Sequence, residues 1–259
     1  MRRDVSALIT GSVTEPAELV FSIAVSALSN ITEENLSITV DGTPVDVREV
    51  ADSCGTRLHV VNAPVGELRV EYSASVTGRA EPVAVEASDA IRYLRPSRYA
   101  ESDMLAPTAG SEFGGVTDAK ELLVKVSSWV GTQLAYVSGS SLPTDGAVRT
   151  LLQRQGVCRD FAHLAITLCR CMNIPARYCT GYLGDIGVPP SDAAMDFSAW
   201  FDVYLGGAWH TFDARHNKPR IGRILMARGR DATDVAISTS FGTAWLAQFD
   251  VITEEVPGG

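Results

Sequence analysis

The first eighty residues alternate between apolar and polar side chains with a period of two, the spacing of half-buried β-strands. The clearest runs cover residues 19–25, 36–40, 58–61 and 68–72. Turn-forming residues separate these runs, and Asp41 followed by Gly42 is typical of a hairpin. Short alternating strands at this spacing predict an antiparallel sandwich or meander. We therefore expect a β-rich, sandwich-like N-terminal domain over residues 1–105.

Farther along the chain, apolar positions recur every three or four residues. Leu122, Val126 and Val130 share one face of an expected helix whose N-cap is Thr117. The pattern predicts two more helices, over residues 147–155 and 158–172, and irregular chain over residues 95–115.

Alternation then returns in the last third of the sequence. Strands are expected over residues 177–183, 197–205, 208–212 and 242–254. Gly206 and Gly207 lie between two of these runs and predict a tight hairpin. Helices followed by an antiparallel sheet define an α+β domain, which we assign to residues 106–259.

Composition and charge narrow the classes of function. Hydrophobic residues make up 46% and charged residues 20% of the chain, which excludes a disordered or fibrous protein. The net charge is −9 and no dense basic run occurs, so we expect no nucleic-acid partner and no attraction to an anionic membrane surface. Asp4 follows the first residues where a secretion signal would carry an apolar segment. These features predict a cytoplasmic protein without membrane spans.

The five cysteines do not form a pattern typical of disulfides or zinc. They are Cys54, Cys158, Cys169, Cys171 and Cys179, with no C-x-x-C pair among them. On a helix, Cys169 lies about 20° from Cys158 and Cys171 about 140° from it, so their sulfurs cannot converge on one ion. We expect no metal and no cofactor, and we interpret the last three cysteines as small buried apolar residues.

Cys158 is the strongest candidate for chemistry. It follows the turn at Gly156 and begins a predicted helix, where free N–H groups and the helix dipole favour a thiolate. The same N–H groups can stabilise the oxyanion that forms when an acyl carbon is attacked. A cysteine that only packs at this position is the alternative.

Five sequence blocks surround and follow this cysteine. They read GVCRDFA (156–162), NIPARY (173–178), TGY (180–182), AWFDVYL (199–205) and WHTFD (209–213). In this order they resemble the bacterial transglutaminase-like proteins. The resemblance implies a papain-like domain, in which a cysteine on a helix packs against an antiparallel sheet and acts with a histidine and an aspartate on amides. Residue by residue, it implies Cys158 as the nucleophile and Asp213 as the carboxylate that orients the base.

One position departs from the family pattern. The family's histidine directly precedes Ala-Trp, where this chain has Ser198, and a serine cannot accept a proton near neutral pH. His216, three residues after Asp213, and His163, five residues after Cys158, are the candidate substitute bases. His163 could instead have a structural role with Asp160. His210 lies at an odd spacing from Asp213 and should face the other side of the sheet.

These features predict thiol-dependent amide hydrolysis or acyl transfer on a peptide or protein substrate, with hydrolysis favoured because water is the default acceptor. Cys158, Ser198 and Asp213 are then expected to meet in one cleft, with Ser198 and Asp213 on the side of the sheet that faces the helix. The alternatives are a catalytically silent module that binds peptides or partners, and a redox-sensing thiol.

The sequence also contains a tract of five arginines after Asp213. The tract comprises Arg215, Arg220, Arg223, Arg228 and Arg230. It is interpreted as a solvated face, with anion binding as the alternative. The oligomeric state is left open.

Overall fold

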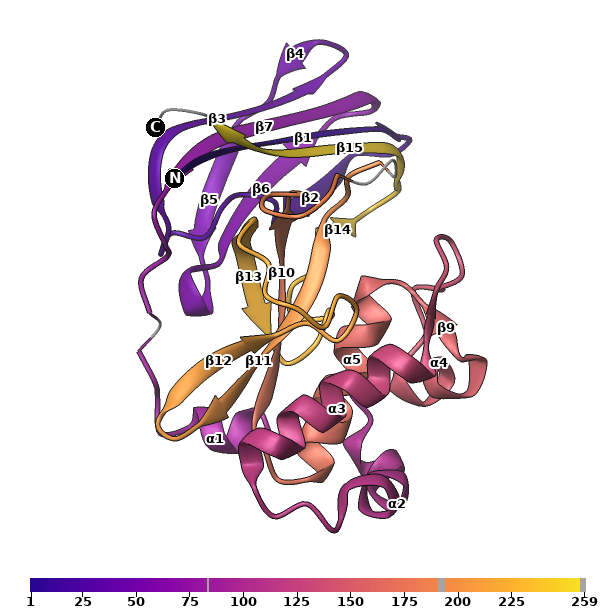
Figure 1. The fold of residues 1–259 in the computed structure, drawn as a ribbon. Coiled ribbons are helices and arrows are strands. Elements are labelled where there is room, and N and C mark those ends of the chain that lie inside the picture. The colour runs from indigo at the N-terminus through magenta and orange to yellow at the C-terminus, as the bar shows by residue number, and fades with distance from the viewer. Residues whose placement is uncertain (83, 191–193, 257–259) are drawn as a thin grey trace.

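Three antiparallel sheets, one two-stranded parallel sheet and a group of helices make up the described part of the molecule (Figure 1). The computed structural model describes residues 1–82, 84–190 and 194–256. Two of the sheets form a sandwich at one end, and the third sheet leads from it to the helices. Antiparallel sheets together with helices confirm the α+β class.

The sandwich follows from the alternation seen in the sequence. Its five-stranded sheet has the order β15 (Ala244–Val256), β1 (Arg2–Val13), β7 (Gly66–Thr77), β3 (Asn30–Val40) and β4 (Thr43–Pro44). Its four-stranded sheet has the order β14 (Ser238–Phe241), β2 (Ala17–Phe21), β6 (Arg57–Ala63) and β5 (Val47–Ala51), with the short 3-10 helix η1 (Ser53–Gly55) between β5 and β6. Every second residue of β1 is buried, including Val5, Ala7 and Ile9. The expected N-terminal sandwich is thus confirmed.

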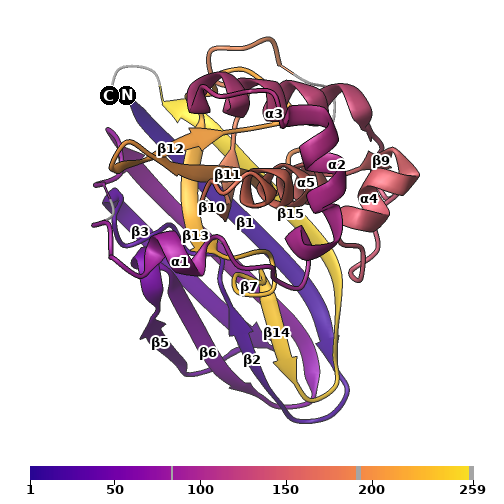
Figure 2. The ribbon, with the colours of Figure 1, turned by 90° about the horizontal axis from the view of Figure 1, so that it is seen from below.

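The last two strands of the chain join this sandwich. β15 pairs with β1 along its whole length, from Arg2 opposite Val256 to Val13 opposite Ala244, and β14 pairs with β2. Figure 2 shows β15 running beside β1. The domain boundary at residue 105 stays a prediction, and the strand pairing assigns residues 238–256 to the sheets of the sandwich.

The third sheet carries the sequence blocks of the second domain. Its order is β12 (Ala208–Phe212), β11 (Ser198–Leu205), β10 (Ala176–Leu183) and β13 (Arg223–Gly229). Gly206 and Gly207 have positive φ angles of 61° and 86° in the predicted hairpin turn between β11 and β12. Such a turn requires the left-handed region at both positions, which glycine adopts without strain.

Helix α5 (Cys158–Cys171) is the centre of the helical region. Residues 160–170 are all buried, because α5 packs on the third sheet while α2 (Ser102–Phe113), α3 (Ala119–Gln133) and α4 (Ala147–Gln153) pack around it. The Asp160 carboxylate accepts the Val157 N–H at 2.8 Å and so caps the start of α5. The helix predicted over residues 158–172 is confirmed. The remaining elements are α1 (Asp89–Arg92), β8 (Ala135–Tyr136) and β9 (Gln155–Gly156).

Two local predictions were wrong. Residues 95–115 contain helix α2 although Pro107 lies inside it, because Leu105, Ala109 and Phe113 recur every four residues and are buried. The N-cap of α3 is Asp118, not Thr117. Its side chain accepts the Glu121 N–H at 2.7 Å.

No helix in the described ranges is long and apolar enough to cross a membrane.

Candidate active site

The Cys158 thiol lies at the start of α5 against the edge of β11. Its Sγ is 3.9 Å from the Phe197 carbonyl oxygen, and the Ala199 N–H donates to it. β12 pairs with β11 only from Phe201 onward, so this stretch of the β11 edge is not covered by β12. The thiol therefore contacts the backbone on both sides of Ser198, the position at which the family has its histidine.

The environment of the Cys158 thiol raises its pKa, whereas the sequence predicted a lowered pKa. Burial raises the pKa of Cys158, and the nearby Asp196 carboxylate adds to this. The Ala199 N–H and the positive charge of Arg215 act in the opposite sense but are weaker. The expected lowering of the pKa by the helix start is therefore wrong in its net direction, because desolvation outweighs the helix start. The resting thiol is protonated at neutral pH.

Arg215 and Tyr136 form one wall beside the thiol. The Arg215 guanidinium carbon lies 3.7 Å from the centroid of the Tyr136 ring, within cation–π distance. Tyr136 is held there because β8 pairs with β9, where it is the partner of Gly156. In the sequence, Arg215 is distinguished only as part of the arginine tract, and Tyr136 belongs to no recognisable motif. Only the pairing of two short distant segments places Tyr136 here, and no local pattern indicates it.

Asp213 directly follows β12 and is buried at the centre of a charged cluster. Its Oδ2 accepts from Arg223 Nη2 at 2.6 Å and lies 2.9 Å from His216 Nδ1. Its Oδ1 accepts the N–H groups of Arg215 and His216 at 3.0 and 3.1 Å. Burial acts to raise the pKa of Asp213, but the hydrogen bond from His216 and the charge of Arg223 lower it to about 2.

The Asp213 carboxylate fixes the tautomer of His216. An ionised carboxylate only accepts hydrogen bonds, so the hydrogen of this contact lies on Nδ1. In the neutral ring Nε2 is then a free proton acceptor. This is the arrangement by which an aspartate orients a histidine base.

Ser198 is the first residue of β11 and lies opposite Gly181. Its hydroxyl oxygen is buried and has no hydrogen-bond partner among the described residues. Trp200 lies on the same face of the strand, and its ring is 5.6 Å from the Arg223 guanidinium carbon that also serves Asp213. Within the described residues, the Ser198 hydroxyl is therefore an unpaired polar group on the face that carries the Asp213 cluster.

This face of the sheet is not the one that faces the helix. Tyr178, the partner of Phe201 across β10 and β11, stacks on His163 of α5 at 4.9 Å between ring centroids. Strand alternation then places Ser198 and Asp213 on the opposite face. The expectation that both side chains face α5 was wrong, since the thiol contacts the strand edge and not a face.

The other candidate residues lie in separate environments. His163 is completely buried between the rings of Tyr99 and Tyr178; its Nε2 accepts the Ala232 N–H at 3.2 Å, and burial lowers its pKa to about 3. It makes no hydrogen bond to Asp160 within the described part of the chain, because Asp160 caps the helix. His210 is exposed and contacts the Leu205 carbonyl oxygen. Among the histidines, only His216 has Asp213 as a hydrogen-bond partner in the described residues.

The remaining cysteines separate into buried and half-buried thiols. Cys169 and Cys179 are buried, as expected, and burial raises the pKa of Cys169 to about 12. Cys171 is only half-buried. Over residues 1–82, 84–190 and 194–256, no three His, Cys, Asp or Glu side chains are grouped to hold a metal ion.

The arginine tract is held by ion pairs and is not simply a solvated face. Arg220 pairs with Asp185, Arg223 with Asp213, Arg228 with Asp202 and Arg230 with Asp234, at 2.6 to 2.9 Å. Arg215, the fifth arginine of the tract, stacks on the Tyr136 ring beside the thiol.

Comparison with known proteins gives a family match and a similar fold. Residues 107–214 match the family model described as the transglutaminase-like superfamily. The structure is similar to that of a candidate cysteine protease from Cytophaga hutchinsonii, with 32% sequence identity, a TM-score of 0.86, and coverage of 98% of this chain and 90% of that one.

Two uncharacterized mycobacterial proteins are also similar. The protein from Mycobacterium leprae is 28% identical over 168 residues, or 62% of this chain. The protein from Mycobacterium tuberculosis strain H37Rv is 34% identical over 124 residues, or 44% of this chain. The matched segments span 59% and 40% of these relatives' own lengths.

Proposed function

The chain belongs to the transglutaminase-like superfamily, and we propose that it performs thiol-dependent amide hydrolysis on a peptide or protein substrate with Cys158 as the nucleophile. Acyl transfer to an amine is the related reaction on the same intermediate. The proposed compartment is the cytosol, where the five free cysteines are kept reduced.

The observation that carries this proposal is the contact between Asp213 and His216. The chain lacks the family's histidine at position 198, yet an imidazole lies 2.9 Å from the aspartate that would orient it. Arg215, the residue directly before His216 in the sequence, acts electrostatically on the Cys158 thiol. We therefore assign His216 as the base, oriented by Asp213.

The proposed reaction begins with a neutral thiol. His216 Nε2 removes the Cys158 proton as the sulfur attacks the amide carbon, and N–H groups at the start of α5 stabilise the resulting oxyanion. The imidazolium then gives its proton to the departing amine, which leaves a thioester on Cys158. Water, deprotonated by the same imidazole, hydrolyses the thioester and restores the free thiol. Because burial raises the pKa of Cys158, the base has to act during the attack and not before it.

The test uses amide substrates with a chromogenic leaving group, assayed on the intact chain. Cys158→Ala is expected to abolish turnover, and His216→Ala to lower kcat by about 10²–10⁴-fold, the usual contribution of a general base. His210→Ala is the matched control because His210 is an exposed histidine on β12, the strand that leads to Asp213 and His216. Full activity in His216→Ala would exclude the assigned base. Added hydroxylamine separates acyl transfer from hydrolysis, since only transfer yields the hydroxamate.

A silent peptide-binding module is the second candidate. Ser198 in place of the family's histidine and the raised pKa of Cys158 favour it. Ser198→His distinguishes the two functions, because it returns an imidazole to the position at which the family has its histidine, between the two residues whose backbone contacts the thiol. A native chain inert on all substrates, together with a Ser198→His variant that gains turnover, would identify a module derived from an enzyme. An active native chain whose kcat is unchanged or lowered by Ser198→His would support His216.

A further inference from the structure

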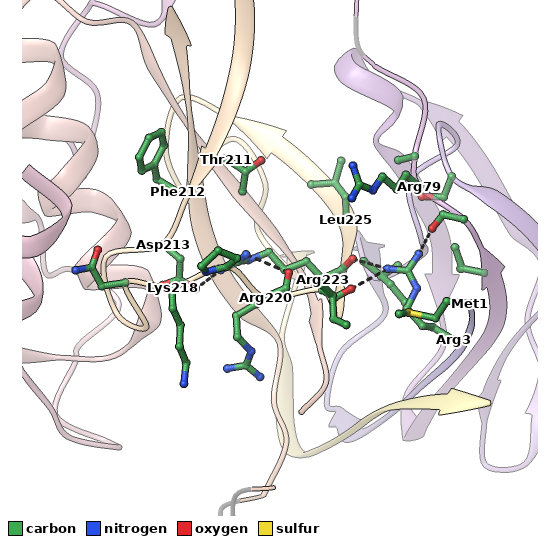
Figure 3. Close-up of a pocket in the computed structure, with 18 of the residues that line it drawn as sticks. Met1, Arg3, Arg79, Thr211, Phe212, Asp213, Lys218, Arg220, Arg223 and Leu225 are labelled. Carbon is green, nitrogen blue, oxygen red and sulfur yellow. Dashed lines mark hydrogen bonds and ion pairs between the residues drawn. The ribbon is translucent and has the colours of Figure 1, made fainter. Parts of the chain in front are cut away.

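A cavity of about 830 Å³ lies between the sandwich and the third sheet. Its walls come from the start of β1, the end of β7, helix α3 and residues 211–225 (Figure 3). Asp213 contributes to its lining, whereas Cys158 does not. The volume is within the range of small-molecule sites in proteins.

Positive charge dominates this cavity. The cations among its lining residues are Arg3, Arg79, Lys218, Arg220 and Arg223. Asp213 is the one described carboxylate that lines it, and it already binds Arg223 and His216. Arg220 pairs with Asp185. This concentration of cations is notable in a chain whose net charge is −9.

Arg3 is the most informative of these residues because it is 93% buried, with 7% of its surface exposed. Its Nη1 donates to the carbonyl oxygens of Ile221 and Arg223, at 3.3 and 3.0 Å, and its Nη2 to that of Gly78. Its Nε has no partner among the described residues. Glu255 lies opposite Arg3 on β15, but it is exposed and forms no ion pair with it in the described structure.

Among the described residues, the buried Arg3 guanidinium has only neutral carbonyl partners and no counter-charge. Such a group is costly to keep ionised, and burial lowers the pKa of Arg3. An anion in the cavity would supply the missing negative charge. Arg79 and Lys218 have no ion-pair partner in the described ranges, so they too are available to a ligand.

Three of the cations lie at two ends of the cavity. Figure 3 shows Arg3 and Arg79 on the side of the sandwich, and Lys218 on the side of the segment that follows Asp213. Arg220, Arg223 and Leu225 lie between these ends. A ligand that satisfies both ends needs at least two separated anionic groups.

We propose that this cavity binds a small organic polyanion whose phosphate or carboxylate groups contact Arg3 and Arg79 at one end and Lys218 at the other. Neither the assigned nucleophile nor the assigned base lines the cavity. It lies next to the Asp213 cluster because Arg223 both lines the cavity and binds that carboxylate.

Calorimetric titration of the intact chain at constant ionic strength tests the proposal. The probes are pyrophosphate and citrate, and inorganic phosphate serves as the comparison anion with a single anionic group. We expect saturable one-to-one binding of at least one polyanion, with a Kd at least ten times lower than that of phosphate. Binding of pyrophosphate alone would identify phosphate groups as the ligand chemistry, and binding of citrate alone would identify carboxylates.

Variants locate the binding site. The double variant Arg79→Gln and Lys218→Gln changes two exposed side chains and should raise the Kd at least ten-fold. Lys120→Gln together with Arg48→Gln, two exposed cations outside the cavity, should leave the Kd unchanged. Arg3→Gln should abolish binding, and if this variant does not fold, the double variant still decides. No saturable binding of either polyanion, or equal binding in the double variant, would overturn the proposal.

Discussion

Two buried aspartates have similar partners but different proposed roles. Asp202 lies on strand β11 of the third sheet, and Asp213 directly follows strand β12. Asp202 on β11 accepts from Arg177 at 3.0 Å and from Arg228 at 2.9 Å, and Thr211 donates to its other oxygen. Asp213 lies two residues after Thr211 and likewise binds two side chains, one an arginine and the other a histidine. In both clusters burial acts to raise the pKa of the carboxyl, and the cationic partners lower it below its usual value.

The difference lies in which partner can release a proton. Both partners of Asp202 are arginines, which stay charged at any ordinary pH, and the Trp209 ring covers Arg177 at 3.9 Å. A guanidinium cannot act as a general base, so we interpret the Asp202 cluster as structural. The other partner of Asp213 is the imidazole of His216, a group that can act as a general base, which makes the Asp213 cluster suited to chemistry. The exchange of one arginine for one histidine separates the two roles.

The largest expected effect on stability comes from Asp202. Asp202→Asn leaves two buried guanidinium groups without a counter-charge and should lower the free energy of unfolding by about 3–5 kcal/mol. Urea unfolding at pH 7 measures this change. Asp234→Asn is the matched control, because its ion pair with Arg230 is partly exposed and should contribute less than about 1 kcal/mol. Equal losses in the two variants would contradict the closed, structural role of the Asp202 cluster.

The pH dependence of stability gives a smaller effect at Asp213. Its pKa is about 2 in the folded state and about 3.9 in an unfolded chain, so the folded state favours the ionised form. The resulting stabilisation, roughly 2 kcal/mol, is fully present above about pH 4 and is lost as the pH falls toward 2. In Asp213→Asn this part of the acid destabilisation should be absent. Urea unfolding of both proteins from pH 6 to pH 2 checks it, and parallel curves would be inconsistent with the lowered pKa.

The smallest effect concerns the charge beside the thiol. Arg215→Gln removes a cation that lowers the pKa of Cys158, so the thiolate fraction at pH 7.5 should fall by about five-fold, the effect of roughly 1 kcal/mol of charge interaction. Brief iodoacetamide treatment followed by peptide mapping measures the alkylation rate of Cys158. Arg230→Gln, which removes a distant arginine of the same tract, should leave that rate unchanged. A rate that does not respond to Arg215→Gln would mean that the guanidinium acts on Tyr136 alone.

Local patterns predicted the elements that depend on neighbouring residues. The alternation of β1, the glycine hairpin and the start of α5 at Cys158 all rest on residues within a few positions of one another. The contact between Asp213 and His216 is of the same kind, since a spacing of three residues in a turn brings the two side chains together. These features could therefore be inferred from the sequence.

Long-range packing decided the features that the sequence did not show. Pro107 and Gly110 suggest irregular chain, but burial of one face of α2 outweighs their cost to the helix. The contacts of Asp213 with Arg223, and of Arg215 with Tyr136, join residues on separate elements. The raised pKa of Cys158 depends on how deeply the folded protein buries the thiol, which a helix position alone does not indicate.

The pairing of β15 with β1 has a consequence for the order in which the protein is made. About 230 residues separate the end of β1 from the start of β15, which corresponds to roughly 12–46 s of synthesis at about 5–20 residues per second. During that time one edge of β1 is open, and an open strand edge can pair with other chains. The nascent protein can therefore complete its five-stranded sheet only when β15 has been synthesised. A chain released by a ribosome that stalls before residue 244 would be prone to aggregation.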